Sequence, residues 1–202
     1  KNHRPVGGWG NNHLILLAQN FTGYKNLMKL VTAGYLEGFY YRPRIDMELL
    51  RQYSEGLICM SACLKGEVPE RMLNDDYEGA KNAALSFSEI FPDRYYLEIQ
   101  NHGIPEEEAN IQNMKKLSSE LGLPLVCTND AHYAKQDHWE AHDIHICLGT
   151  GKERSDPNRL RYATPEFYFK SQDDMYHLFK DFPEAIENTR KIADSIDLTL
   201  PI

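Results

Sequence analysis

Long apolar segments are missing from this sequence of 202 residues. No apolar run approaches the ~18 residues that a membrane-spanning helix needs. The opening KNHRPVGGWGNN also lacks the apolar core of a secretory signal peptide. These absences argue against a membrane protein, and we expect a soluble, cytoplasmic chain.

Cysteine is scarce as well. The four cysteines, Cys59, Cys63, Cys127 and Cys147, lie within apolar stretches, and no two of them form a Cys-x-x-Cys pair. This pattern argues against both a disulfide framework and a zinc ribbon. We expect reduced thiols, and burial as a small apolar side chain is the default role for each of them.

Basic residues are outnumbered by acidic ones. The chain has 22 Lys and Arg residues against 30 Asp and Glu residues, which gives a formal net charge of −8. Such a chain cannot offer the broad basic face that grips the phosphate backbone of duplex DNA. Any contact with DNA must therefore be local or depend on a metal ion.

What the sequence does contain is an ordinary globular composition, 42% hydrophobic and 26% charged, which suits one folded domain. Continuous apolar runs predict strands, and apolar residues spaced three and four apart predict helices. The predicted strands are 13–20, 57–63, 94–100 and 123–128. The predicted helices are 23–38, 47–54, 75–91, 106–121, 137–149, 173–180 and 183–196.

Local signals mark the ends of several of these elements. Asp46 is a predicted N-cap, and Gly122 is a predicted C-terminal stop. The segment LKGEVPE (64–70) reads as a loop, and 150–166 reads as a surface excursion rich in charge and turn formers. Strands that alternate with helices predict parallel β/α units in an open sheet or a barrel. Ligands in such folds collect at the C-terminal ends of the strands.

The strongest chemical signal is TNDAHY (128–133), directly after a predicted buried strand. Asp130 and His132 are two apart, and an extended backbone sends both side chains to the same side. A carboxylate and an imidazole suit zinc, manganese or iron, and an open strand end leaves room for water. The alternative is a capped turn with a hydrogen-bonded histidine.

Three further residues lie near predicted strand ends. Cys63 follows an apolar run and is either a thiolate ligand or a buried apolar side chain. His102 follows another strand and either lines the site or serves as a turn residue. His13 opens its strand, which is the wrong end for the site unless this strand pairs antiparallel; a core or capping role is its alternative.

The predicted helix 137–149 carries His138, His142 and His145 on one face. Exposed histidines on a polar helix face are usually solvated. We therefore expect no direct metal site there. His142, which follows the Asp130 and His132 pair most closely, could line the site or support its ligands.

Several blocks together, in this order, resemble one family: HLILLAQNFTGYKNLMKLVTAGYLEGFYYRPRID, GLICMSACLKGEVP, YYLEIQNHGIPEEE and LPLVCTNDAHY. They are similar to the PHP domain of bacterial DNA polymerase III alpha subunits, the replicative family C polymerases. The similarity runs over nearly the whole chain, so residues 1–202 are interpreted as one PHP domain. Block order and length make the resemblance far more specific than any single motif.

The resemblance implies an α/β fold, a partial PHP-type distorted (β/α)7 barrel, with metal ions at its strand ends. Carried over by position, the metal ligands are His13, Cys63, Asp130 and His132, and zinc or manganese is the implied metal. Such sites suit phosphoester hydrolysis, which in this family would give 3′-to-5′ proofreading of a DNA end. The implied partners are DNA, a proofreading exonuclease subunit and the sliding clamp, with no membrane.

The family pattern also begins with a His-x-His motif and further ligands upstream of HLILLAQN, and this sequence does not contain them. We therefore expect a fragment that presents about half of the ligand set and is inactive in isolation. The magnesium-binding carboxylates of the polymerase site belong to a palm domain expected after residue 202. No catalytic residue for nucleotidyl transfer can be assigned here.

Three functions remain open from the sequence. The first is a metal-dependent exonuclease site within a DNA-directed DNA polymerase. The second is a non-catalytic scaffold that stabilises the polymerase and docks a proofreading subunit. The third is a free-standing PHP phosphatase that acts on a small phosphate ester.

Overall fold

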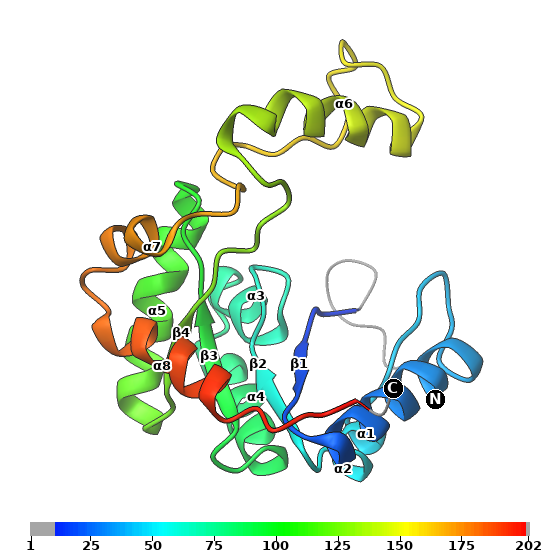
Figure 1. Cartoon of the computed structure of the whole chain (residues 1–202), viewed down its shortest axis with the longest axis vertical. Helices are drawn as coiled ribbons and strands as arrows, with labels where there is room; N and C mark the ends of the chain where they lie inside the picture. Colours follow the sequence, from blue (N-terminus) through cyan, green and yellow to red (C-terminus); the bar gives the residue numbers. More distant parts are fainter. Residues whose placement is uncertain (1–10, 201–202) are drawn as a thin grey trace.

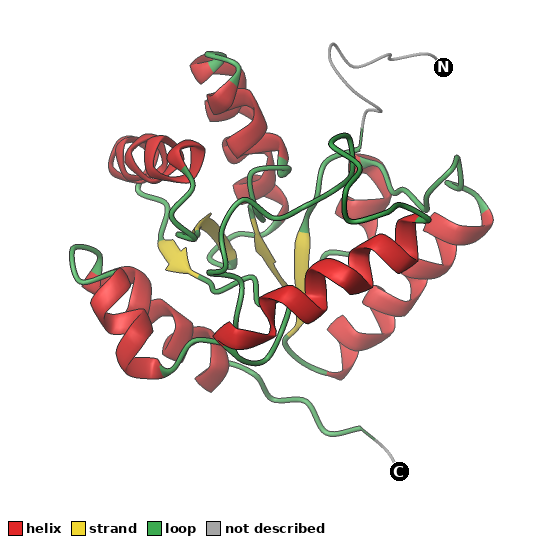
Figure 2. Ribbon diagram, turned by 90° about the horizontal axis from the view of Figure 1, so that it is seen from above, coloured by secondary structure: helices red, strands yellow, loops and turns green. Residues whose placement is uncertain are grey.

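The computed structural model describes residues 11–200 of the chain. The opening KNHRPVGGWG and the last two residues of the predicted 1–202 domain lie outside this range. Within it the chain forms four β-strands and eight α-helices (Figure 1). Seen from above, the strands lie in the middle and the helices surround them (Figure 2). None of the described helices has the length and apolar character needed to cross a membrane.

The sheet has the order β1-β2-β3-β4. Its strands are β1 (Ile15–Ala18), β2 (Leu57–Met60), β3 (Tyr95–Ile99) and β4 (Leu125–Cys127). β2, β3 and β4 run parallel, whereas β1 pairs antiparallel with β2. The predicted α/β class and all four predicted strands are thus confirmed. In residues 11–200 no pairing joins β1 to β4, so the described residues do not show the closed barrel that the family resemblance implied.

The helices follow the sequence prediction with one exception. Asp46 caps its helix by accepting a hydrogen bond from the Leu49 N–H, and Gly122 ends another helix in the left-handed conformation at φ 67°, both as predicted. The helices are α1 (Phe21–Leu36), α2 (Met47–Gln52), α3 (Glu67–Leu73), α4 (Tyr77–Ile90), α5 (Pro105–Leu121), α6 (Trp139–Thr150), α7 (Gln172–Leu178) and α8 (Pro183–Asp194).

The exception is α3, because the prediction that 64–70 is entirely a loop was wrong. Pro69 is compatible with this helix because it lies in the first turn of α3, where a helix has no acceptor for the missing N–H. Val68 and Met72 are buried on one side of the helix. Arg71 pairs with Glu67 one turn earlier, so a short helix is stabilised on both faces.

The core lies on both faces of the sheet, and β2 shows why. Leu57 and Cys59 belong to the large buried cluster with α4 and α5, while Ile58 and Met60 pack with Ile192 of α8. This alternation follows from the period of two along a strand. Every residue of β2 is buried, as expected for a parallel strand with helices on both sides.

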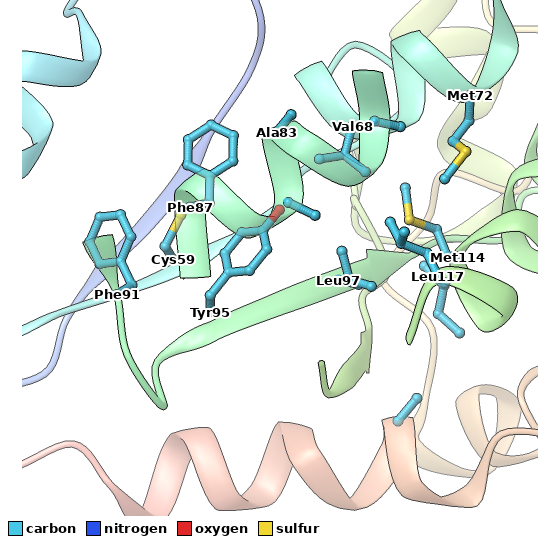
Figure 3. Packing of buried hydrophobic residues seen from close by; sticks show 14 of the residues in the cluster. Cys59, Val68, Met72, Ala83, Phe87, Phe91, Tyr95, Leu97, Met114 and Leu117 are labelled. Carbon is cyan, nitrogen blue, oxygen red and sulfur yellow. The ribbon is translucent and has the colours of Figure 1, made fainter. Parts of the chain in front are cut away.

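The large cluster is filled by aromatic and aliphatic side chains from β3, α4 and α5 (Figure 3). The rings of Phe87 and Tyr95 stack with centroids 5.6 Å apart. Leu97 meets Met114 and Leu117 of α5, and all three are fully buried. This packing holds β3 rigidly and so fixes the residues at its C-terminal end.

An arm, defined here as residues 134–166, leaves the sheet after β4 and returns before α7. It contains a short 3₁₀ helix (Gln136–His138) and α6, and it projects beyond the rest of the chain (Figure 1). Backbone hydrogen bonds close its base, from the His132 N–H to the Phe167 carbonyl (2.8 Å) and from the Phe169 N–H to the Tyr133 carbonyl (2.9 Å). The predicted surface excursion 150–166 is its returning segment.

We predict that Gly23→Ala lowers the free energy of unfolding by about 1–3 kcal/mol. A methyl group built at Gly23 would lie 1.8 Å from the carbonyl oxygen of Gly56, so α1 could not approach the start of β2 as it does. Urea denaturation followed by circular dichroism measures the effect.

The matched control is Gly149→Ala in α6, where nothing lies within 4 Å of the added methyl group. This change should leave stability equal or raise it by up to ~1 kcal/mol. Equal stability of both variants would show that the close approach of Gly23 to Gly56 is not a packing constraint.

Candidate metal centre at the strand ends

His13 and Cys63 meet at the edge of the sheet where β2 ends. Because β1 runs antiparallel to β2, the residue that precedes β1 lies beside the residues that follow β2. The backbone N–H of His13 donates to the Lys65 carbonyl at 2.9 Å. Its Nδ1 then lies 3.5 Å from the Cys63 Sγ. The antiparallel pairing that His13 needed to reach the site is therefore present.

Asp130 and His132 form a second pair after β4. The Asp130 Oδ2 lies 3.6 Å from the His132 Nε2, and each side chain is about one third exposed (38% and 34%). Asp130 has a positive φ of 44°, which Asp tolerates better than most residues. The hydroxyl of Tyr162, which comes from the returning segment of the arm, lies 3.2 Å from the Nδ1 and 3.3 Å from the Nε2 of His132.

The two pairs are electrostatic neighbours. Burial raises the pKa of the Cys63 thiol, and the Asp130 and Glu98 carboxylates raise it further. Burial likewise raises the pKa of the Tyr162 hydroxyl, with contributions from Asp130 and Cys63. Within residues 11–200, however, no three His, Cys, Asp or Glu side chains lie close enough together to hold a metal ion as they stand. The described residues therefore present two half-sites on one edge.

The donor types fit a divalent transition metal. Two imidazoles, a thiol and a carboxylate are ligands that zinc takes readily, and imidazole and carboxylate also suit manganese. Because the Cys63 thiol has a raised pKa, a metal ion would have to displace its proton on binding.

Glu98, which no sequence pattern singled out, connects the loops behind the two pairs. It is only 3% exposed, in the middle of the otherwise apolar β3. Its Oε2 accepts from the Ala62 N–H at 3.0 Å, next to Cys63. Its Oε1 accepts from the Gln100 side-chain amide at 2.9 Å and from the Thr128 hydroxyl at 2.5 Å. A glutamate within an otherwise apolar predicted strand is the sequence signal that could have identified Glu98.

Glu98 thus links the residues that follow β2 to those that follow β4. Burial raises its pKa, three hydrogen bonds to the carboxylate oppose that effect, and the Asp130 charge adds to it. The loop after β2 is tight, because Ala62 has φ 65°. A positive φ is costly for alanine, and the hydrogen bond from the Ala62 N–H to Glu98 helps to hold this conformation.

His102 lies beneath the site with both ring nitrogens engaged. Its Nε2 lies 2.7 Å from the Asn129 carbonyl, and its Nδ1 lies 2.7 Å from the Glu107 carboxylate. The ring stacks on Phe167 with centroids 3.9 Å apart and is 1% exposed. In this arrangement neither nitrogen is open to a metal ion, and His102 positions the Asn129 backbone beside Asp130.

His142 is the one histidine of α6 that reaches the neighbourhood of the site. Its ring lies 5.1 Å from those of Tyr133 and Tyr162 and 6.0 Å from that of His132. Burial lowers its pKa, and His132 and His145 lower it further. His138 and His145 are exposed on the arm.

Comparison with known proteins gives consistent matches. Residues 5–102 match the PHP domain family. The chain is 52% identical over 185 residues to the DNA polymerase III subunit alpha of Borreliella burgdorferi and 47% identical over 190 residues to that of Treponema pallidum. It is 40% identical over 193 residues to that of Thermus aquaticus. These alignments cover 92–94% of this chain but only 16% of each relative.

We predict that Glu98→Gln lowers the free energy of unfolding by about 1–3 kcal/mol, although the side chain keeps its size. Glutamine has one acceptor oxygen where glutamate has two. It therefore cannot accept from the Ala62 N–H at one position and from the Gln100 and Thr128 donors at the other. Chemical denaturation at pH 7 measures the change.

Glu89→Gln on the exposed face of α4 is the control and should stay within about 0.5 kcal/mol of the parent chain. If the two variants are equally stable, Glu98 does not hold these loops together.

Proposed function

Because the chain contains a PHP domain and matches one segment of the DNA polymerase III alpha subunits, we propose that it is the metal-binding part of a replicative polymerase. Its proposed reaction is metal-dependent hydrolysis of a phosphodiester bond at a 3′ DNA end. The observation that supports this proposal is that His13 with Cys63, and Asp130 with His132, lie on one edge of the sheet. DNA and the other replicase subunits, including a proofreading subunit and the sliding clamp, are the proposed partners, in the cytoplasm.

His13, Cys63, Asp130 and His132 would hold the metal, zinc or manganese. When bound, such ions polarise a phosphoryl group and supply hydroxide near neutral pH. The chain's own residues prepare this site. Tyr162 orients the His132 ring through its hydroxyl, and Glu98 holds the two ligand loops together. Magnesium for nucleotidyl transfer would bind in another part of the parent polymerase.

A second candidate function is a scaffold that stabilises the polymerase and docks a separate proofreading subunit. It is favoured by the arrangement of the ligands, since the described residues present two pairs and no closed set of three. A free-standing phosphatase has the least support, because the relatives are polymerase subunits of which this chain spans 16%.

We predict that the chain binds zinc or manganese and that His132→Gln and Asp130→Asn each weaken binding about 10- to 100-fold, as expected for the loss of a ligand or of its partner. Equilibrium dialysis followed by elemental analysis measures the affinity. His138→Gln and Asp137→Asn on the arm are matched controls, because these side chains lie outside both pairs. Unchanged binding in the first two variants would contradict the proposed site.

The two candidate functions differ in the full-length polymerase. If the site is catalytic, Asp130→Asn should abolish metal-dependent removal of a mismatched 3′ nucleotide while DNA synthesis continues. If the domain is a scaffold, the same change should leave both fidelity and assembly with the proofreading subunit unaltered. A primer-extension assay on mismatched primers, with Asp137→Asn as the control, distinguishes these results.

A further inference from the structure

A cavity of about 510 Å³ is lined by residues of α6 and of the returning segment of the arm. Three arginines and three aromatic rings line it, from Arg154, Arg159, Arg161, Tyr133, Trp139 and Tyr162. A volume of this size lies within the usual range for small-molecule and nucleotide sites, ~300–1,000 Å³. None of the four proposed metal ligands lines this cavity, and Tyr162 is the residue that it shares with the site proposed above.

The cavity carries an excess of positive charge in an acidic chain. Arg159 is buried and makes a bidentate pair with Asp143, at 2.5 and 2.8 Å. Hydrogen bonding to Arg159 lowers the pKa of Asp143, which therefore stays ionised. Arg154 is shared between Asp143 (3.4 Å) and Glu140 (3.3 Å). These contacts fix two of the three guanidinium groups in place.

Arg161 supplies the third guanidinium group of the cavity. It is exposed, and no carboxylate of the described residues lies within ion-pair distance of it. The positive charge of Arg161 contributes to the lowered pKa of Asp143, so Arg161 lies near the ion pair between Arg159 and Asp143. A free guanidinium beside two fixed ones is a local anion site, and its planar fork matches the geometry of a phosphate group.

The aromatic residues add a second kind of contact. Trp139 is 43% exposed and lines the cavity, so a flat ring could stack on its indole. The Tyr133 hydroxyl is buried and has no hydrogen-bond partner among the described residues. Buried polar groups normally have partners, so this hydroxyl is suited to a polar group of a ligand. Phosphate recognition alone would need neither residue.

Tyr162 connects the cavity to the strand ends. It lines the cavity, and its hydroxyl lies 3.2 Å from the Nδ1 of His132. Tyr162 therefore lies between the cavity and the Asp130 and His132 pair. The chain as a whole has a charge of −8, which opposes a broad duplex-binding face and favours a short, local contact.

We propose that this cavity binds the end of a single DNA strand, with a phosphodiester group on Arg161 and an unstacked base against Trp139. This inference rests on the proposed function, because it supplies the substrate for the metal centre. The bound strand passes Tyr162 and presents its terminal phosphodiester bond to His132.

Fluorescence anisotropy with a labelled oligothymidine, measured in EDTA, tests the cavity independently of metal binding. Arg161→Ala should weaken binding at least fivefold and reduce the salt dependence by about one counterion. Trp139→Ala should weaken binding about tenfold. Arg190→Ala is the matched control on α8, where Arg190 is exposed and pairs with Asp194, and it should bind like the parent chain.

Competitors identify the ligand class. Thymidine monophosphate should displace the oligonucleotide at lower concentration than inorganic phosphate, since only the nucleotide offers a base. Equal competition by both would overturn the proposed base contact. Absence of oligothymidine binding, or equal loss in Arg161→Ala and Arg190→Ala, would overturn the proposal as a whole. Because EDTA removes metal ions, these results are separate from failure of the metal centre.

Discussion

The antiparallel pairing of β1 with β2 is the constraint on which the rest of the site depends. In a sheet of parallel strands only, the residue that opens β1 would lie at the opposite edge from Cys63. The reversed strand places His13 3.5 Å from that thiol, and the parallel strands β2, β3 and β4 bring the residues that follow them to the same edge. The buried cluster around Tyr95 and Leu97 keeps these strands in register, so the positions of the proposed ligands follow from packing far from the site.

Polar groups beneath the edge then set the local geometry. Glu98 joins the loops that carry Cys63 and Asp130 by accepting from the Ala62 N–H and the Thr128 hydroxyl, with a third hydrogen bond from Gln100. His102 contacts Glu107 through Nδ1 and the Asn129 backbone carbonyl through Nε2. Glu98 and His102 are almost fully buried, so their hydrogen bonds form in surroundings of low dielectric. A buried polar group that lacks a hydrogen-bond partner is costly there. The arm returns to the sheet just before Phe167, whose carbonyl accepts from the His132 N–H, and it contributes Tyr162, which lies beside His132 and also lines the cavity that holds the arginines.

Sequence patterns predicted most elements of the fold, because strands, helices and caps are encoded locally. Asp46 caps a helix with its side chain and Gly122 ends one in the left-handed conformation, both as predicted, whereas the segment 64–70, predicted as a loop, contains the start of α3. Asp130 and His132 could be proposed as a ligand pair from the sequence, since they lie two residues apart. The direction of β1, the burial of Glu98 and the double engagement of His102 depend on contacts between distant segments. No local pattern specifies these contacts, and the same holds for the closure of a barrel.

X-ray absorption spectroscopy of the zinc-loaded chain tests the central claim most directly, because it reports the atoms that surround the metal. We expect one sulfur neighbour, from Cys63, at about 2.3 Å from the zinc, together with imidazole nitrogens at about 2.0–2.1 Å. The sulfur contribution should vanish in Cys63→Ser. A spectrum with oxygen neighbours alone, unchanged by that substitution, would contradict a metal centre built from these strand ends.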